Sequence, residues 1–323
     1  PSMRFQSSPS AWTGAIFSCC AGIGAMSKHI LVTGGNSGIG LALCKLLATS
    51  TQPNSDFPTP APPPCYVYLG ARNPEKGEAA VKKIVDEFPD AAGKIEMLQI
   101  DVSDDASCTS AAAALKAKGV RLYALVNNAG LGLAQDEAAG SGVEQILNTN
   151  FLGPKRVTEA MVELIDPAEG RVVNTSSGGA SMWLKKQDPA LKATMSNPEV
   201  TFEELDKTIK EQVAAGNLGM GNGYGMSKAA LNGLTLVHAR AFPHLKVVAL
   251  SPGFIDTPMT RGFNARLTPE QGCVSSLVCL FSEVTSGYYY GSDGLRSPFT
   301  MTRDPGMPAY EGEDDPAQEK YSR

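Results

Sequence analysis

Long apolar runs and blocks of basic residues are both missing from this chain. None of its 323 residues lie in an uninterrupted apolar run of the length that crosses a bilayer, so we expect no membrane span. Its 28 Lys and Arg residues are outnumbered by 33 Asp and Glu residues, for a net charge of −5. Because no basic cluster is available to neutralise phosphates, we expect no nucleic acid partner.

Metal-binding and disulfide patterns are also scarce. The chain has only three histidines, without ligand spacing, and seven cysteines, none of them in a C-x-x-C pair. An odd number of unpaired cysteines argues against a disulfide framework and against a structural zinc site. We therefore predict no metal and a reducing compartment, with the cytoplasm as the default location.

The two ends differ from the rest of the chain. Residues 1–25 are rich in Ser, Ala and Gly, and Arg4 is their only charged residue. They read as a low-complexity extension, or as the remnant of a targeting peptide, in which case an organelle such as a plastid is possible. Residues 301–323 are rich in Pro and acidic residues, and we interpret them as an acidic surface tail.

Between these ends, short aliphatic runs alternate with amphipathic patterns, and residues 49–64 form a proline-rich loop. The runs lack strict alternation, as buried parallel strands do. Alternating β and α elements predict one α/β domain over residues 26–300, a doubly wound parallel sheet of the Rossmann type. The expected strands are His29–Thr33, Tyr66–Leu69, Ile95–Ile100, Leu122–Val126, Arg171–Asn174 and Lys246–Leu250, and the helices include Leu41–Leu47, Glu75–Phe88 and Val143–Ile165.

A glycine-rich loop follows the first expected strand and precedes a helix. Its glycines permit a tight turn and a close approach of backbone N–H groups to a pyrophosphate, which the positive end of the helix also attracts. The strand-loop-helix context strengthens this interpretation. The predicted cofactor-binding residues here are Gly34, Asn36, Ser37, Gly38, Ile39 and Gly40.

With this loop, the sequence resembles the short-chain dehydrogenases/reductases. The family pattern continues in order through Asn127-Asn128-Ala129-Gly130, Asn150, Ser176-Ser177, Tyr224-Gly-Met-Ser-Lys228 and Ser251-Pro252-Gly253. The resemblance implies a nicotinamide cofactor. It assigns adenine contacts to Asp101 and Val102, while Asn128, Ala129 and Gly130 line the cofactor. The nicotinamide end falls to Pro252, Gly253, Ile255 and Thr257, and Asp101 has the alternative role of a helix N-cap.

The second expected strand ends without an acidic residue, and Arg72 follows it. An acid at this place holds a ribose 2′-hydroxyl, whereas a 2′-phosphate needs a cation. The planar guanidinium of Arg72 suits a phosphate, so we predict NADP(H) as the cofactor. The alternative is a solvated surface arginine. Several NADPH-using members of the family also carry a basic residue directly before the Gly38-Ile39-Gly40 sequence, where this chain has Ser37.

Tyr224 and Lys228 are four residues apart on an expected helix and so share a face. We expect the ammonium group to lower the pKa of the phenol, which then acts as proton donor to a carbonyl. By resemblance, Ser177 holds the substrate carbonyl and Asn150 completes the catalytic set; Ser176 and Asn148 are the alternatives. These residues predict reduction of a ketone or aldehyde. A non-catalytic subunit of a larger assembly and an NADP-dependent alcohol dehydrogenase are the competing functions.

An insertion, residues 180–222, separates Ser177 from Tyr224. Carbonyl reductase and the plant menthone- and salutaridine-reductase-like enzymes of the family carry similar insertions. Thr201 and Glu204 form a capping box, which predicts a helix over Phe202–Ala215. Its apolar stripe, Phe202, Leu205, Ile209 and Val213, is expected to cover the helix face used for oligomerisation and to make the protein a monomer. The alternative is that the stripe covers the substrate pocket, where Met182 and Trp183 are also candidates.

Overall fold

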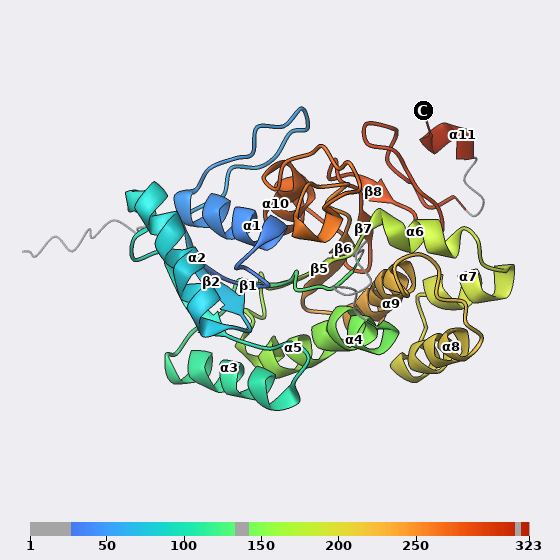
Figure 1. The fold of residues 1–323 in the computed structure, drawn as a ribbon, viewed down its shortest axis with the longest axis horizontal. Helices are drawn as coiled ribbons and strands as arrows, with labels where there is room; N and C mark the ends of the chain where they lie inside the picture. The colour runs from blue at the N-terminus through green and yellow to red at the C-terminus, as the bar shows by residue number, and fades with distance from the viewer. Residues whose placement is uncertain (1–26, 133–141, 314–317, 323) are drawn as a thin grey trace, which may run out of the picture.

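The computed structural model describes residues 27–132, 142–313 and 318–322 (Figure 1). The extension over residues 1–25, proposed from composition, lies outside the described residues. Within them, no helix is both long enough and apolar enough to cross a membrane. The described part also contains no cluster of three His, Cys, Asp or Glu side chains that could hold a metal ion.

The described residues form one eight-stranded sheet, in the order β3-β2-β1-β4-β5-β6-β7-β8. Neighbouring strands are parallel except β7 and β8, which pair in the antiparallel sense. The doubly wound fold expected from the sequence is therefore confirmed. The strands are β1 (Lys28–Thr33), β2 (Cys65–Ala71), β3 (Ile95–Gln99), β4 (Ala124–Asn127), β5 (Arg171–Thr175), β6 (Lys246–Leu250), β7 (Tyr289–Tyr290) and β8 (Arg296–Ser297).

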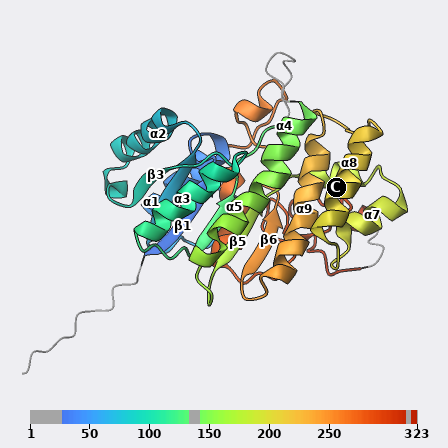
Figure 2. The same cartoon turned by 90° about the horizontal axis from the view of Figure 1, so that it is seen from below.

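Helices cover both faces of the sheet, as Figures 1 and 2 show. On one face lie α1 (Gly38–Thr49) and α10 (Val274–Phe281), and α2 (Pro74–Glu87) packs beside β2 and β3. On the other face lie α3 (Asp105–Ala117), α4 (Val143–Leu147), α5 (Gly153–Met161) and α9 (Tyr224–Ala241). The central strands are buried between these two layers, which explains why their sequences are continuous apolar runs.

The helix expected over Val143–Ile165 is not continuous. A π-helical turn over Asn148–Leu152 separates α4 from α5, and a 3₁₀ turn over Val162–Leu164 follows α5. Pro154 has no N–H group to donate to the carbonyl of Asn150, four residues earlier, so regular α-helical pairing cannot pass this point. The turn matters because it carries Asn150.

The insertion forms α6 (Gly178–Leu184), α7 (Pro189–Ser196) and α8 (Phe202–Ala214), all packed against α9. The capping box at Thr201 and Glu204 is present. Leu205 and Ile209 are buried in the apolar cluster that includes α9, and Phe202 and Val213 pack against it. The stripe therefore covers α9 as expected. Trp183 is buried in the same cluster, which favours a core role for it, whereas Met182 is exposed.

The acidic C-terminal segment is not a simple surface tail, which corrects the interpretation from composition. Its described part is anchored at both ends, because Arg303 and Tyr321 are buried. The backbone N–H of Asp304 donates to the carbonyl of Tyr321, in α11 (Gln318–Tyr321), and Tyr310 N–H donates to the carbonyl of Arg296. Composition indicates solvation on average, but it does not reveal single buried anchors.

Candidate active site

The glycine loop between β1 and α1 is packed too tightly for side chains. A Cβ on Gly40 would lie 2.3 Å from the carbonyl oxygen of Gly34, and one on Gly34 would lie 2.9 Å from Ala129 Cα. Gly34 and Gly38 both have positive φ, at 65° and 54°. Ser37 begins α1 without a side-chain cap, so the first-turn N–H groups have no side-chain acceptor there. Such a helix end suits an anionic ligand.

Thr33 fastens the loop to the segment after β4. Its hydroxyl oxygen accepts hydrogen bonds from the N–H groups of Asn128 and Ala129, each at 3.0 Å. Asn128 in turn donates from Nδ2 to the carbonyl of Thr33 at 2.9 Å. The resemblance placed Asn128 and Ala129 beside the cofactor but did not single out Thr33. Its position directly before the first glycine was the only available signal.

Arg72 and Asp101 lie at neighbouring strand ends. Arg72 Nε is 3.9 Å from Asp101 Oδ2, and the arginine side chain is 75% exposed. The guanidinium therefore has most of its donors free for an anionic group. Asp101 does not cap a helix, which excludes that alternative. Its Oδ1 accepts from both the N–H and the hydroxyl of Ser103, and Asp104 is the N-cap of α3.

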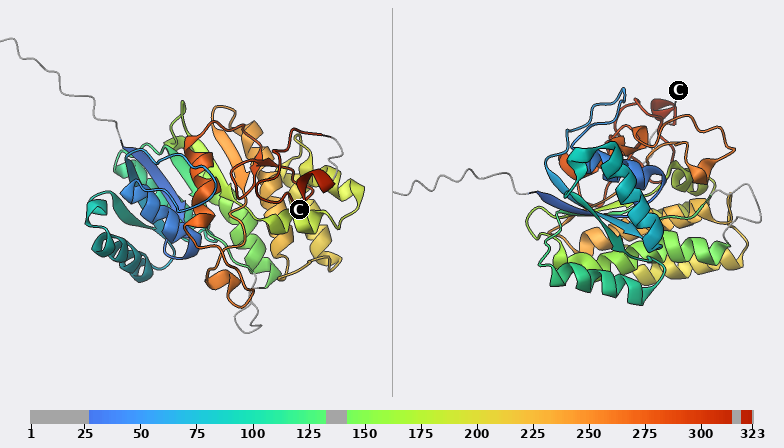
Figure 3. Two further views of the ribbon diagram at one scale, coloured as in Figure 1. Left: turned by 90° about the horizontal axis from the view of Figure 1, so that it is seen from above. Right: turned by 60° about the vertical axis from the view of Figure 1, so that its left-hand side comes forward.

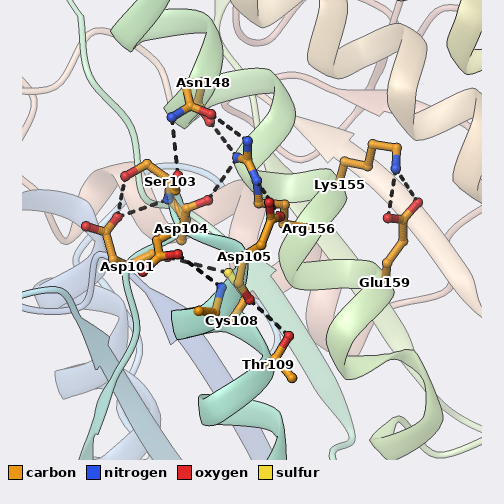
Figure 4. Close-up of polar contacts among 12 residues, drawn as sticks. Asp101, Ser103, Asp104, Asp105, Cys108, Thr109, Asn148, Lys155, Arg156 and Glu159 are labelled. Carbon is orange, nitrogen blue, oxygen red and sulfur yellow. Dashed lines mark hydrogen bonds and ion pairs between the residues drawn. The ribbon is translucent and has the colours of Figure 1, made fainter.

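Asn148 and Asn150 contact different parts of the fold. Asn148 accepts a hydrogen bond from Arg156 and donates to the carbonyl of Ser103, on the side of α3 and Asp101 (Figure 4). Asn150 is fully buried, and it donates to Ser227 Oγ at 3.0 Å. Its amide also pairs with both backbone groups of Leu131. The geometry thus brings Asn150, and not Asn148, to α9.

Tyr224 begins α9 and is enclosed by two glycines. A Cβ on Gly132 would lie 2.4 Å from the Tyr224 ring, and one on Gly179 would lie 3.4 Å from it and 3.3 Å from Ser177 Oγ. Ser177 is thus on the same side as the phenol. Ser176 instead donates to the carbonyl of Lys228 at 3.2 Å. Gly132 was not among the residues found from the sequence, because a single glycine outside a motif carries no signal.

Lys228 is 4% exposed, and its ammonium nitrogen lies 5.9 Å from the centroid of the Tyr224 ring. It donates a hydrogen bond of 2.7 Å to the carbonyl of Thr175. A Cβ on Gly130 would lie 3.5 Å from this nitrogen and 3.3 Å from Asn150 Oδ1. Lys228, Asn150 and Gly130 therefore lie close together beyond the carboxyl ends of β4 and β5.

Burial, and not the charge of Lys228, has the largest effect on the pKa of Tyr224. Desolvation raises the pKa of Tyr224 above its usual value, and the neighbouring Ser177 hydroxyl acts in the opposite direction. Desolvation also lowers the pKa of Lys228 to about 8. The expected lowering of the phenol pKa by the ammonium is therefore wrong for this structure, because both groups have lost water.

The segment after β6 returns to the glycine loop. A Cβ on Gly38 would lie 3.4 Å from Thr257 Cγ2, and both residues line a pocket of about 250 Å³. Ile255 is buried against Gly272, and Gly253, after Pro252, has φ +94°. Val102 packs against Gly153 at the start of α5. The contact between Gly38 and Thr257 therefore brings the segment after β6 beside the glycine loop.

A doubly wound sheet, a glycine-rich loop between β1 and α1, and a Tyr-Lys pair on α9 are together typical of dinucleotide-dependent oxidoreductases. The short chain dehydrogenase family model matches residues 28–188. A (+)-neomenthol dehydrogenase of Arabidopsis thaliana is 31% identical over 72% of this chain and 84% of its own length. The chain therefore belongs to the short-chain dehydrogenase/reductase family and is an oxidoreductase.

Two further relatives are similar over most of the chain. Carbonyl reductase [NADPH] 1 of Homo sapiens is 30% identical over 75% of this chain and 86% of its own. The solved structure of salutaridine reductase from Papaver somniferum has a TM-score of 0.68 and 26% identity, and it covers 82% of this chain and 99% of that one. The expected similarity to these branches of the family is confirmed.

Proposed function

We propose that this protein reduces a ketone or aldehyde to an alcohol with NADPH. The observation that carries the proposal is the meeting of Tyr224, Ser177 and Lys228 beside the glycine loop. When bound, NADPH would supply the hydride. The glycine loop and the first turn of α1 would hold its pyrophosphate, and Pro252, Gly253, Ile255 and Thr257 its nicotinamide end.

The side chains have separate roles in this proposal. The Ser177 hydroxyl donates a hydrogen bond to the substrate carbonyl oxygen, and the Tyr224 phenol donates the proton that this oxygen gains. The raised pKa of Tyr224 keeps the phenol protonated at neutral pH, as a proton donor must be. Lys228 holds positive charge beside the phenol, and Asn150 ties the segment after β4, at Leu131, to Ser227 on α9.

Arg72 supports NADPH over NADH. Its side chain is 75% exposed at the end of β2, and its ion-pair partner is Asp101, which follows β3. Asp101 Oδ1 accepts from Ser103, so only its Oδ2 faces the arginine. A 2′-phosphate placed there would meet a cationic fork.

The names of the relatives support a small-molecule carbonyl substrate. One is called a neomenthol dehydrogenase, one a salutaridine reductase and one a carbonyl reductase [NADPH]. Loss of NADPH absorbance with a panel of cyclic ketones, aldehydes and quinones tests the proposal. The corresponding alcohols, supplied with NADP⁺, test the reverse direction. No turnover in either direction, despite NADPH binding, would favour a non-catalytic subunit instead.

The proposal includes a monomer in the cytosol. In support, α8 packs on α9 in one apolar cluster, and the five described cysteines, all buried, are free thiols, which is typical of a reducing compartment. Fractionation of cells that express the full-length protein tests the location. Recovery from an organelle would point to a targeting role for residues 1–25.

A further inference from the structure

A buried ion pair fastens the C-terminal segment to the rest of the domain. The side chains of Arg303 and Asp293 are 0% and 1% exposed. Their contact is bidentate, with N–O distances of 2.9 and 2.6 Å. The remaining donors of Arg303 reach the carbonyls of Pro308 at 2.8 Å and Met307 at 2.6 Å. A buried pair of this kind is strong only when its hydrogen bonds are satisfied, as these are.

Asp293 belongs to the turn between β7 and β8. Its Oδ1 also accepts from the N–H of Leu295 at 3.1 Å, and its Oδ2 from the N–H of Gly306 at 2.8 Å. Arg303 therefore neutralises the carboxylate that shapes this turn. Residues 303–308 and the β7–β8 turn are thus joined at the edge of the sheet that β8 forms. Figure 3 shows this C-terminal part in dark red.

The turn supports the segment after β6. A Cβ on Gly253 would lie 3.1 Å from Ser292 Cβ, so Ser292 packs directly on the Gly253 backbone. Gly253 N–H donates to Ser251 Oγ at 3.4 Å, and Gly178 N–H donates to the same oxygen at 3.0 Å. A shift of Ser292 would therefore reach Gly253 and, through Ser251, the residue that follows Ser177.

We propose that Arg303 and Asp293 are positioning residues of the dinucleotide site. They hold Ser292 against Gly253, so that the segment after β6 keeps the shape that receives the nicotinamide end of NADPH. This inference rests on the proposed function for the ligand. It also assigns a role to the C-terminal segment, whose composition indicates only a tail. Loss of Arg303 would leave Asp293 buried without its countercharge, and the turn would rearrange.

The test is titration of NADPH into the full-length protein, followed by nucleotide fluorescence. In Arg303→Met, we expect the Kd to rise about tenfold or more, because small displacements in a binding segment have large effects. Arg303→Lys keeps the charge but not the bidentate contact with Asp293. Its Kd for NADPH should lie between those of Arg303→Met and the wild type. The kcat at saturating NADPH should change less than the Kd does.

Tyr123→Phe is the matched control for stability. The buried Tyr123 hydroxyl donates to the carbonyl of Leu280 at 2.6 Å. Tyr123 directly precedes β4, so this bond lies at the opposite end of the strand from the candidate site. This variant should unfold at lower temperature with an unchanged Kd. The same pattern in Arg303→Met would show a merely structural role and overturn the inference.

Other outcomes are equally decisive. If Arg303→Met does not fold, the Lys variant carries the test, and an unchanged Kd there overturns the inference. If the wild-type protein itself does not bind NADPH, the proposed function is wrong and the inference with it. Binding by the wild type with a raised Kd in Arg303→Lys supports both.

Discussion

The ammonium group of Lys228 donates a 2.7 Å hydrogen bond to the carbonyl oxygen of Thr175, at the end of β5. The lysine is thus held by the sheet, while its nitrogen lies 5.9 Å from the centre of the Tyr224 ring. The contact fixes α9 relative to β5 at the point where Ser176 and Ser177 follow the strand. A buried lysine with one backbone partner is costly to charge, and this cost gives a measurable pH dependence.

We expect the wild type to gain stability relative to Lys228→Met between about pH 8 and about pH 10. Burial lowers the pKa of Lys228 to about 8 in the folded protein, whereas an unfolded chain keeps a value near about 10.4. Between these values the unfolded state binds the extra proton, so the free energy of unfolding rises with pH. Below about pH 8 both states are protonated, and the lysine contributes a constant unfavourable amount.

Urea denaturation at several pH values measures this difference. Lys207→Met serves as the control, because Lys207 is 78% exposed on α8. A difference between wild type and Lys228→Met that stays flat across this range would contradict the lowered pKa.

Tyr224→Phe should reduce kcat by about 10²- to 10⁴-fold, the range that a positioned proton donor contributes. The Kd for NADPH should stay close to that of the wild type, because the change removes only the hydroxyl group. Tyr66→Phe, on β2, is the control and should leave kcat unchanged. Full activity in Tyr224→Phe would mean that another group donates the proton.

The neighbouring serines provide a matched pair. Ser177 also caps α6 by accepting from Gly179 N–H at 3.0 Å, so its replacement by alanine would mix catalysis with a cap loss of about 1 kcal/mol. Ser177→Gly avoids most of that loss and should still reduce kcat/KM by about 10²-fold or more. Ser176→Ala removes a hydrogen bond to α9 and should affect stability more than turnover. The opposite ranking would assign the substrate contact to Ser176.

Arg72→Glu should lower kcat/KM with NADPH by about ten- to a hundredfold, the size of a charged hydrogen bond or two. Activity with NADH should fall less or even rise, because a carboxylate can accept from a ribose hydroxyl. Lys76→Glu makes the same charge change one turn into α2 and should leave the ratio of the two activities unchanged. An NADPH preference that survives Arg72→Glu would contradict the cofactor proposal.

Most of the fold followed from local patterns. Buried parallel strands have recognisable apolar runs, and these predict six of the eight strands in the described residues. β7 and β8 were missed because two-residue strands have no periodicity to detect. The break at Asn148–Leu152 was missed although Pro154 signals it, since the flanking apolar pattern continues across the turn.

The candidate site was predictable where a motif fixes both the residue and its spacing, as for Tyr224 and Lys228. It was not predictable where the effect depends on the surroundings. The direction of the Tyr224 pKa shift follows from burial, which no spacing reveals. The pairing of Arg303 with Asp293 requires two loops to meet, and composition indicates only an acidic, solvated segment there.

We expect the oligomeric state to follow from the contact between α8 and α9. A Cβ on Gly233 would lie 2.6 Å from Leu205 Cδ2, so the two helices approach closely at this glycine. With the α9 face already covered, we expect light scattering after size-exclusion chromatography to give the mass of one chain, 33.9 kDa, at micromolar concentration. A species of twice that mass would contradict the monomer.

Leu205→Ala tests whether the covering matters. The fully buried side chain leaves a cavity when it is shortened, and the free energy of unfolding should fall by about 2 to 5 kcal/mol. Lys207→Ala, exposed on the same helix, is the control and should change stability by less than about 0.5 kcal/mol. If Leu205→Ala lost no stability, α8 would not be held on α9, and the argument that it replaces a partner subunit would fail.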